Sequence, residues 1–385
     1  MKEEKKSAVE EPISEKRRQL LCASGAGTLA ALFGGLFSAS NGVRAEPVGQ
    51  SVPVVDRLSI QVLVDSFHQA LAPSQTINGI EIRRFSLPVT EQQPRHALHS
   101  EFGLSVHLES ARGDETRQIL LDFGYTPEAL LNNMRIMNIQ PEELEALVLS
   151  HGHFDHFGGL LGFLETNRDR LRAGIPLYVG GEECFCTREL NIPERIGNFG
   201  YLDREAIQNL DVQITFAERP SIVAGHAFTT GQIAADTFER VLSPTRMRVG
   251  ITNGVGCFPE GLNPEKRELS VIPDDFEHEQ ATCFHVKDRG LVVITSCGHR
   301  GVVNSTKRAM AISGTDKVHA ILGGFHLSPH TDEYVHETVM ALKELKPDLV
   351  VPMHCTGEAF HRIIAEEMPD NWVRSYNGTR YTFGA

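Results

Sequence analysis

The chain has 385 residues, a net charge of −13 at neutral pH and a hydrophobic content of 41%. This length supports a sizeable core in one large domain. The acidic balance excludes a nucleic-acid ligand that is held by broad phosphate contacts. A small substrate inside a pocket, anionic or neutral, is compatible with it, so we expect a small-molecule substrate.

Residues 1–45 have the features of an export signal. Arg17 and Arg18 form a twin-arginine-like motif ahead of a weakly apolar stretch at 23–38, and Ala45 ends a small-residue cleavage site. Because the apolar stretch is short and glycine-rich for a spanning helix, we expect no stable membrane insertion after cleavage. We therefore predict twin-arginine export to the periplasm, with a retained membrane anchor as the alternative. The remaining residues, 46–385, are treated as one domain.

An apolar run at 146–149 leads into a loop that is unusually rich in metal-binding side chains. The candidate ligands of this loop are His151, His153, Asp155 and His156. In an extended loop, residues two apart point the same way, so His151 and His153 can reach one ion. The chain then turns toward a predicted helix that begins near Leu160, which lets Asp155 and His156 face a second ion. Imidazole and carboxylate suit zinc, iron or manganese.

Three later apolar runs end just before a histidine, as the first one does. The runs at 291–295, 318–322 and 348–351 precede His299, His326 and His354, respectively. A helical stretch at 331–345 separates the last two runs. Ligands of α/β proteins gather at the carboxyl ends of strands, so we predict one site that all four strand ends assemble. His299 and His354 are predicted metal ligands, and His326 is predicted as a ligand or a substrate contact.

A further strand at 119–121 ends in Asp122. Its carboxylate is well placed to accept a hydrogen bond from a ligating imidazole, which would fix the histidine tautomer. The alternative is a simple turn. We expect Asp122 to lie directly behind the metal ligands.

The order His-x-His-x-Asp-His before two glycines resembles the signature of the metallo-β-lactamase-fold superfamily. Further segments, among them 297–304, 323–327 and 352–357, make the chain similar to a subgroup typified by the archaeal dihydropterin–ribofuranosylaminobenzene 5′-phosphate synthase. The resemblance implies an αββα sandwich with a metal site on one edge. It also implies that Asn304 and Thr356 lie around the ligands or contact substrate.

The chain departs from that pattern at two places. Most of the superfamily has a metal-bridging aspartate where this chain has Cys297, followed by His299. We expect His299 to be the ligand and Cys297 to lie beside it, because a ligating cysteine must be a thiolate and would be open to oxidation after export. The segment 231–236 also lacks the arginine that is usual in the subgroup, so a contact to a substrate anion is missing.

These features predict a metal-dependent hydrolase of a small phosphoester, ester or lactone that uses metal-activated water. Asp155 would hold a metal and move a proton, and His326 or Thr356 would bind the developing oxyanion. One or two divalent ions are expected per chain, with zinc favoured and iron or manganese open. The region 165–270 lacks ligand motifs, so we predict an insertion that covers the site. A C–N bond-forming synthase and a non-catalytic metal or ligand-binding module are the alternatives.

Overall fold

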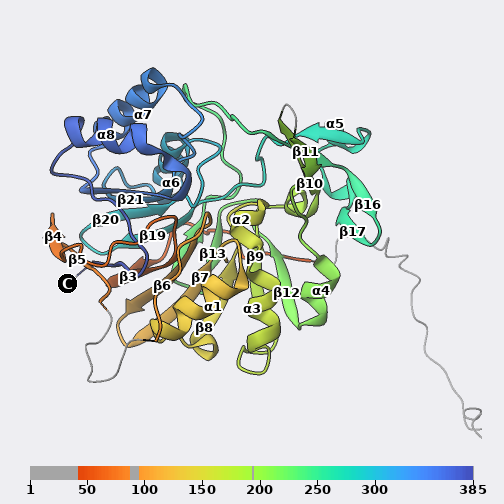
Figure 1. Ribbon diagram of the computed structural model, residues 1–385, viewed down its shortest axis with the longest axis horizontal. Coiled ribbons are helices and arrows are strands. Elements are labelled where there is room, and N and C mark those ends of the chain that lie inside the picture. The colour runs from red at the N-terminus through yellow and green to blue at the C-terminus, as the bar shows by residue number, and fades with distance from the viewer. Residues whose placement is uncertain (1–41, 87–94, 193–194, 385) are drawn as a thin grey trace, which may run out of the picture. The chain divides into compact units, whose positions relative to one another are not determined.

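The described residues of the computed structural model, 42–86, 95–192 and 195–384, are organised around two large β-sheets (Figure 1). The first sheet has ten strands in the spatial order β1 (Val43–Arg44), β12 (Val212–Phe216), β9 (Ile175–Val179), β8 (Leu144–Val148), β7 (Glu115–Leu121), β6 (Ser105–Arg112), β3 (Arg57–Val64), β23 (Arg380–Phe383), β5 (Ile80–Arg83) and β4 (Gln75–Ile77). The second sheet has seven, in the order β13 (Ser221–Val223), β14 (Ala227–Thr229), β19 (Thr282–Val286), β20 (Gly290–Ile294), β21 (Val318–Gly324) and β22 (Leu349–Met353), with β2 (Val54–Val55) paired to β19.

The two sheets pack face to face over a shared apolar core. Alternate residues of the first sheet, such as Ile60 and Val106, meet Val292 and Leu322 of the second, and all four are fully buried. Every second side chain of a strand points toward the opposite sheet, so the apolar side chains on that face are buried between the two sheets. This packing forms the inner layers of the fold.

Helices cover the outer face of each sheet (Figure 1). The first sheet is covered by α1 (Pro127–Ile136), α3 (Leu160–Asn167) and α4 (Arg204–Asn209), and the second by α6 (Val302–Ser313), α7 (Asp332–Glu344) and α8 (Glu358–Glu367). The helix predicted at 331–345 is α7, which begins after the capping residue Thr331, whose hydroxyl accepts a hydrogen bond from the Tyr334 N–H. The layers are therefore α, β, β, α.

A third, smaller sheet lies outside these layers. It contains β11 (Arg195–Asn198), β10 (Thr187–Ile192), β15 (Thr245–Arg248) and β18 (Val271–Pro273), and a hairpin of β16 (Gly250–Thr252) and β17 (Val255–Cys257) adjoins it, as does the short helix α5 (Pro264–Arg267). A disulfide joins Cys186 to Cys257 and closes a loop across this subdomain.

The stretch 165–270, which we predicted as one insertion, is not a single unit. β9 and β12 belong to the ten-stranded sheet, and β13 and β14 belong to the seven-stranded sheet. Only β10, β11, β15 to β17 and their connections lie outside both sheets, and β18 extends this subdomain to Pro273. The prediction of a single insertion was wrong because the short core strands in this region carry no ligand motif that would identify them.

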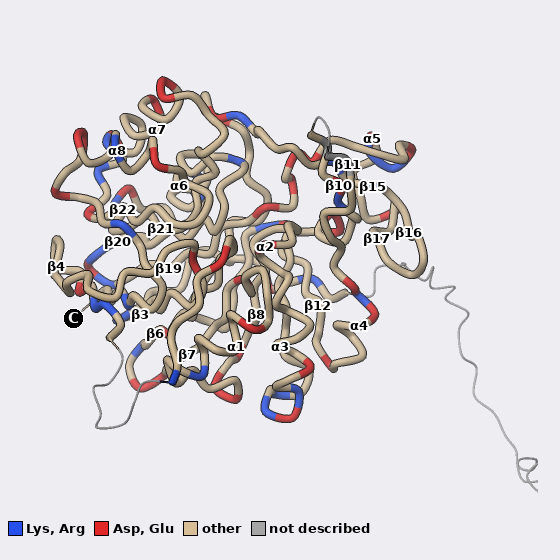
Figure 2. Tube along the Cα trace, viewed as in Figure 1, with Lys and Arg blue, Asp and Glu red and all other residues tan. Residues whose placement is uncertain are grey.

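The predicted export segment lies outside the described residues, except for 42–45. There β1 pairs in parallel with the edge strand β12, and the Ala45 N–H donates to the Phe216 carbonyl at 2.8 Å. Among the described residues, no helix combines the length and apolar character needed to cross a bilayer. Figure 2 shows Lys and Arg interspersed with Asp and Glu along the loops and outer helices.

Candidate metal centre

The carboxyl ends of strands from both sheets meet at one edge of the sandwich. β7 and β8 run parallel in the first sheet, and β20, β21 and β22 run parallel in the second. The residues that follow these strands include every metal ligand predicted from the sequence. The four-strand assembly expected from the apolar runs is therefore present in the fold.

The loop after β8 enters a helix earlier than expected. The short helix α2 (Phe154–Phe157) precedes α3, so Asp155 and His156 lie in a helical turn, whereas His151 and His153 lie in the extended segment before it. Two glycines follow α2 where the chain approaches the end of β7. A Cβ atom on Gly158 or Gly159 would lie only 2.2 Å from a backbone carbonyl oxygen of Tyr125 or Phe123, respectively, which explains the need for glycine.

The first cluster consists of His151, His153 and His299. Their ring centroids form a nearly equilateral triangle with separations of 5.0, 4.9 and 4.9 Å. Three imidazoles bound to one tetrahedral ion by bonds of about 2.1 Å would have centroids roughly 5 Å apart. One ligand nitrogen from each residue lies within 4.8 Å of the others. The spacing of the three rings thus fits a single divalent ion.

The second cluster consists of Asp155, His156 and His354, whose ligand atoms also lie within 4.8 Å of one another. Oδ2 of Asp155 lies 3.1 Å from Nε2 of His354 and 3.9 Å from Nε2 of His156. Burial lowers the pKa of His354, but the adjacent Cys355 and Asp155 raise it to about 9. The ligand atoms of the three residues are thus close enough together to share one cation.

Buried ligand atoms without partners mark both clusters. Nε2 of His151, Nε2 of His156, Oδ1 of Asp155 and both ring nitrogens of His299 have no hydrogen-bond partner among the described residues. Buried polar atoms are normally paired, so such a concentration requires an explanation. Burial, together with neighbouring imidazoles, lowers the pKa of His151 and of His299 well below the usual value, so both rings are held neutral. Neutral imidazole is the form that binds metal.

Asp122 fixes the tautomers of two candidate ligands. Its Oδ2 accepts from Nδ1 of His156 at 2.7 Å and from the hydroxyl of Ser150 at 2.7 Å, and that hydroxyl accepts from Nδ1 of His151 at 2.9 Å. Nε2 of each imidazole is therefore left with a lone pair for a cation. The predicted position of Asp122 behind the ligands is the position that the structure gives it.

His153 is oriented by residues that were not predicted from the sequence. Its Nε2 lies 3.0 Å from the Thr245 hydroxyl and 3.3 Å from Oδ2 of Asp274, so Nδ1 is the atom left for a metal. Asp274 in turn accepts from Nε of Arg188 at 3.1 Å, and the Arg188 side chain is 1% exposed. These residues come from the small third sheet and the segment after it. No local pattern around them points to the loop at 150–156.

Backbone strain is concentrated at the same edge. Asp122, Ser296, His326 and His354 are non-glycine residues with φ between +46° and +59°, and each follows a central strand by one or two residues. A non-glycine residue in this region costs on the order of 1–3 kcal/mol, so the surrounding structure must hold it there. The strain accompanies the sharp turns that direct these side chains toward the clusters.

The remaining predicted site residues have distinct places. The hydroxyl of Thr356 donates to the Met353 carbonyl at 2.6 Å and accepts from the Phe325 N–H, so it ties two strand ends together. Asn304 donates to the Arg300 carbonyl and accepts from the Asp236 N–H. These hydroxyl and amide groups are committed to backbone partners, and neither residue lines the cavity beside His354.

His326 lies next to Cys297 and to His299 of the first cluster. Nδ1 of His326 is 3.6 Å from Sγ of Cys297, and its Nε2 is 3.1 Å from the Leu242 carbonyl oxygen. The His326 ring centroid is 3.9 Å from that of His299. The carbonyl thus occupies one ring nitrogen of His326, and the role of this residue in binding an oxyanion stays a prediction.

A cavity of about 490 Å³ opens beside the second cluster. His326, His354 and Cys355 form its inner wall, and Phe67 and Phe102 line its outer part. The two aromatic residues are 39% and 58% exposed, and the Phe102 ring lies 4.6 Å from that of His354. No lysine or arginine is among the described residues that line this cavity.

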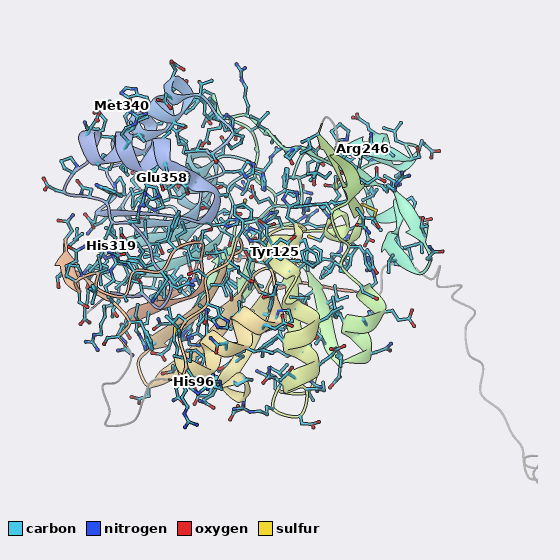
Figure 3. All side chains as sticks on the ribbon, viewed as in Figure 1. His96, Tyr125, Arg246, His319, Met340 and Glu358 are labelled. Carbon is cyan, nitrogen blue, oxygen red and sulfur yellow. A yellow bond between two sulfur atoms is a disulfide. The ribbon has the colours of Figure 1, made fainter. Side chains whose placement is uncertain are left out.

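A second cavity, of about 510 Å³, lies beside α2 and is lined by Tyr125, Phe154 and Phe199. The Phe199 ring makes an edge contact with His153 at 5.5 Å, and Tyr125 makes one with Phe154 at 5.0 Å. Figure 3 labels Tyr125 next to α2. Aromatic residues of one cavity therefore contact the first cluster, and those of the other cavity contact the second.

Comparison with known proteins agrees with this geometry. The model of the metallo-beta-lactamase superfamily matches residues 110–180. Over 285 residues the chain is 30% identical to 7,8-dihydropterin-6-methyl-4-(beta-D-ribofuranosyl)-aminobenzene-5'-phosphate synthase of Methanocaldococcus jannaschii, and the match covers 72% of this chain and 89% of the relative. The chain belongs to the metallo-beta-lactamase superfamily.

Two further proteins are similar to this chain. An uncharacterized protein of the same organism is 25% identical over 68% of this chain and 87% of its own length. The crystal structure of a metal-dependent hydrolase of the beta-lactamase superfamily has a TM-score of 0.60 and 25% identity, covering 84% of this chain and 98% of that one. The predicted metallo-beta-lactamase αββα sandwich is confirmed. Membership of the superfamily implies a divalent metal, and the two clusters supply the residues to hold it.

Proposed function

We propose that this protein is a metal-dependent hydrolase of a small, neutral, ring-containing ester or lactone. The observation that carries the proposal is the cavity wall formed by His354, His326 and Cys355, which continues into Phe67 and Phe102 without any lysine or arginine among its described lining residues. A substrate in this cavity would meet the metal centre on one side and aromatic surface on the other. Such a wall favours an apolar ring over a phosphate group.

Different residues would bind the metal ions, accept a proton and hold the substrate. His151, His153 and His299 would hold one divalent metal, and Asp155, His156 and His354 a second. Bound there, the metal supplies a Lewis acid that polarises a carbonyl group and makes water reactive at neutral pH. The unpartnered Oδ1 of Asp155 is available to accept a proton from the attacking water. Phe67 and Phe102 would hold the substrate ring over the centre.

A second candidate function is C–N bond formation, which the 30% identity to the pterin-pathway synthase favours. Two aromatic-lined cavities, each with an aromatic residue in contact with one of the clusters, would suit a reaction that joins two ring-containing substrates. The phosphate in that enzyme's name argues for the hydrolase instead, because the described cavity linings hold no lysine or arginine to pair with it.

The test begins with full-length protein that is stripped by a chelator and reloaded with zinc. Esters, lactones and phosphoesters are each assayed alone, and the pterin and arylamine substrates of the relative are assayed together. We expect zinc-dependent turnover of neutral esters or lactones, with His151→Ala inactive. Zinc-dependent product from the paired substrates, with no turnover of any ester or lactone, would establish the synthase instead. Metal content without turnover of any kind would favour a binding module.

A further inference from the structure

The sulfur atom of Cys297 reaches ligand atoms from both metal clusters. Cys297 follows β20 and is 2% exposed. Its Sγ lies within 4.8 Å of ligand atoms of His151 and His156, and also within 4.8 Å of those of His299 and His326. Cys297 therefore stands between the two clusters rather than beside one of them.

The distance between Cys297 and His326 matches the distance expected between two ligands of one zinc ion. Sγ of Cys297 and Nδ1 of His326 are 3.6 Å apart. A sulfur at about 2.3 Å and a nitrogen at about 2.1 Å from one tetrahedral zinc ion would be separated by roughly 3.6 Å. Because the Leu242 carbonyl oxygen takes the N–H at Nε2 of His326, the Nδ1 lone pair is directed to the sulfur side.

Cys355 fits a shared ion less well. Its Sγ lies 3.2 Å from that of Cys297. Two thiolates on one tetrahedral zinc ion would be roughly 3.8 Å apart, so the two sulfurs would have to separate before they could share a metal. This comparison selects Cys297 with His326, and leaves Cys355 as the neighbouring thiol.

We propose that Cys297 is itself a thiolate ligand that would join the two metal positions, rather than a neighbour of the ligands as the sequence predicted, with His326 as a further ligand on the side of the cavity. The proposal rests on the metal dependence proposed above. On binding, the sulfur–metal bond replaces the S–H bond, and the proton leaves to solvent. A thiolate among imidazoles favours zinc over manganese at the shared position. It would supply a negative charge between the two cations, at a strand end whose own residues, 295–299, include no carboxylate.

Cobalt(II) absorption tests the proposal without an activity assay. Full-length protein is stripped, loaded with two equivalents of cobalt(II), and its metal content and spectrum are measured. We expect a strong thiolate-to-cobalt charge-transfer band in the near ultraviolet that is lost in Cys297→Ala and retained in Cys355→Ala. Cys283→Ala, which removes a free buried thiol from an apolar cluster that contains no candidate ligand, is the matched control and should retain the band.

A second variant separates the thiolate from the metal site as a whole. Cys297→Asp should bind two cobalt ions per chain and lack the charge-transfer band, because a carboxylate replaces the sulfur. Cobalt-loaded wild-type protein without the band, or a band that survives in Cys297→Ala and disappears in Cys355→Ala, would overturn the assignment. A protein that binds no cobalt would overturn the metal dependence itself.

Discussion

Asp122 accepts a hydrogen bond from Nδ1 of His156 at 2.7 Å, and this contact decides which nitrogen of the imidazole can bind a metal. The same carboxylate acts on His151 through the Ser150 hydroxyl. One buried aspartate at the end of β7 thus sets the tautomer of a histidine in each cluster. Such outer partners raise ligand basicity and fix ring orientation.

Asp122→Asn should weaken zinc binding by about 10–100-fold, the usual effect of losing an outer carboxylate. The amide keeps the shape of the side chain but loses the charge that supports both imidazoles. Competition with a chromophoric chelator measures the affinity. Asp348→Asn is the control, because Asp348 accepts a 2.7 Å hydrogen bond from Nδ1 of His319 outside the centre. Equal zinc affinity in the two variants would contradict the role of Asp122.

Zinc should stabilise the folded protein against heat, since a cation replaces protons and pairs buried ligand atoms. At a free concentration of 100 times its Kd, a single ion adds about 2.7 kcal/mol to the free energy of unfolding. His151→Ala should lose most of this increment. His107→Ala, which removes a buried histidine whose partner is Gln118, should keep it. Scanning calorimetry with and without zinc measures both, and a full increment in His151→Ala would refute the first cluster.

Arg188→Met should lower the free energy of unfolding by about 3–5 kcal/mol, because it leaves the buried carboxylate of Asp274 without its cation. It should also weaken zinc binding, since Asp274 orients His153. Urea unfolding and chelator competition measure the two effects. Arg362→Met breaks an exposed ion pair with Asp332 and should cost no more than about 1 kcal/mol. Similar losses in the free energy of unfolding for both variants would show that the buried ion pair contributes no more to stability than the exposed one.

Replacing Cys186 and Cys257 together by serine should lower the free energy of unfolding by about 2–5 kcal/mol. The disulfide links residues 71 apart in sequence and so restricts a long loop of the unfolded chain. Dithiothreitol should lower the melting temperature of the wild-type protein and leave that of the double variant unchanged. A reductant effect of the same size in both proteins would assign the sensitivity to other thiols.

Export by the twin-arginine route remains a prediction for residues outside the described range. Changing Arg17 and Arg18 to lysine should keep the protein in the cytoplasm, and fractionation of cells measures this. Mass spectrometry of exported protein locates the cleavage. Cleavage after Ala45 would remove β1 and expose the edge of β12, whereas cleavage before Val43 would retain that pairing. Unchanged periplasmic delivery of the lysine variant would refute the route.

The sequence by itself determined the elements that carry the metal centre. Apolar runs of strand length, each followed by a histidine, located β8, β20, β21 and β22 to within two residues, because a buried parallel strand has a continuous apolar pattern. The dense loop at 150–156 and the carboxylate of Asp122 were predictable for the same reason. Their chemistry is local, and short-range spacing fixes it.

Only the tertiary structure decided which residues surround those ligands. Arg188 and Asp274 are 86 positions apart, and Asp274 is 121 positions from His153, so no periodic pattern connects them. Likewise, β9 and β12 joined the ten-stranded sheet although their region carries no ligand motif. The place of Cys297 between two clusters also depends on how the two sheets meet at one edge. These contacts depend on packing between segments that are distant in the sequence, and local sequence patterns do not show which distant segments pack together.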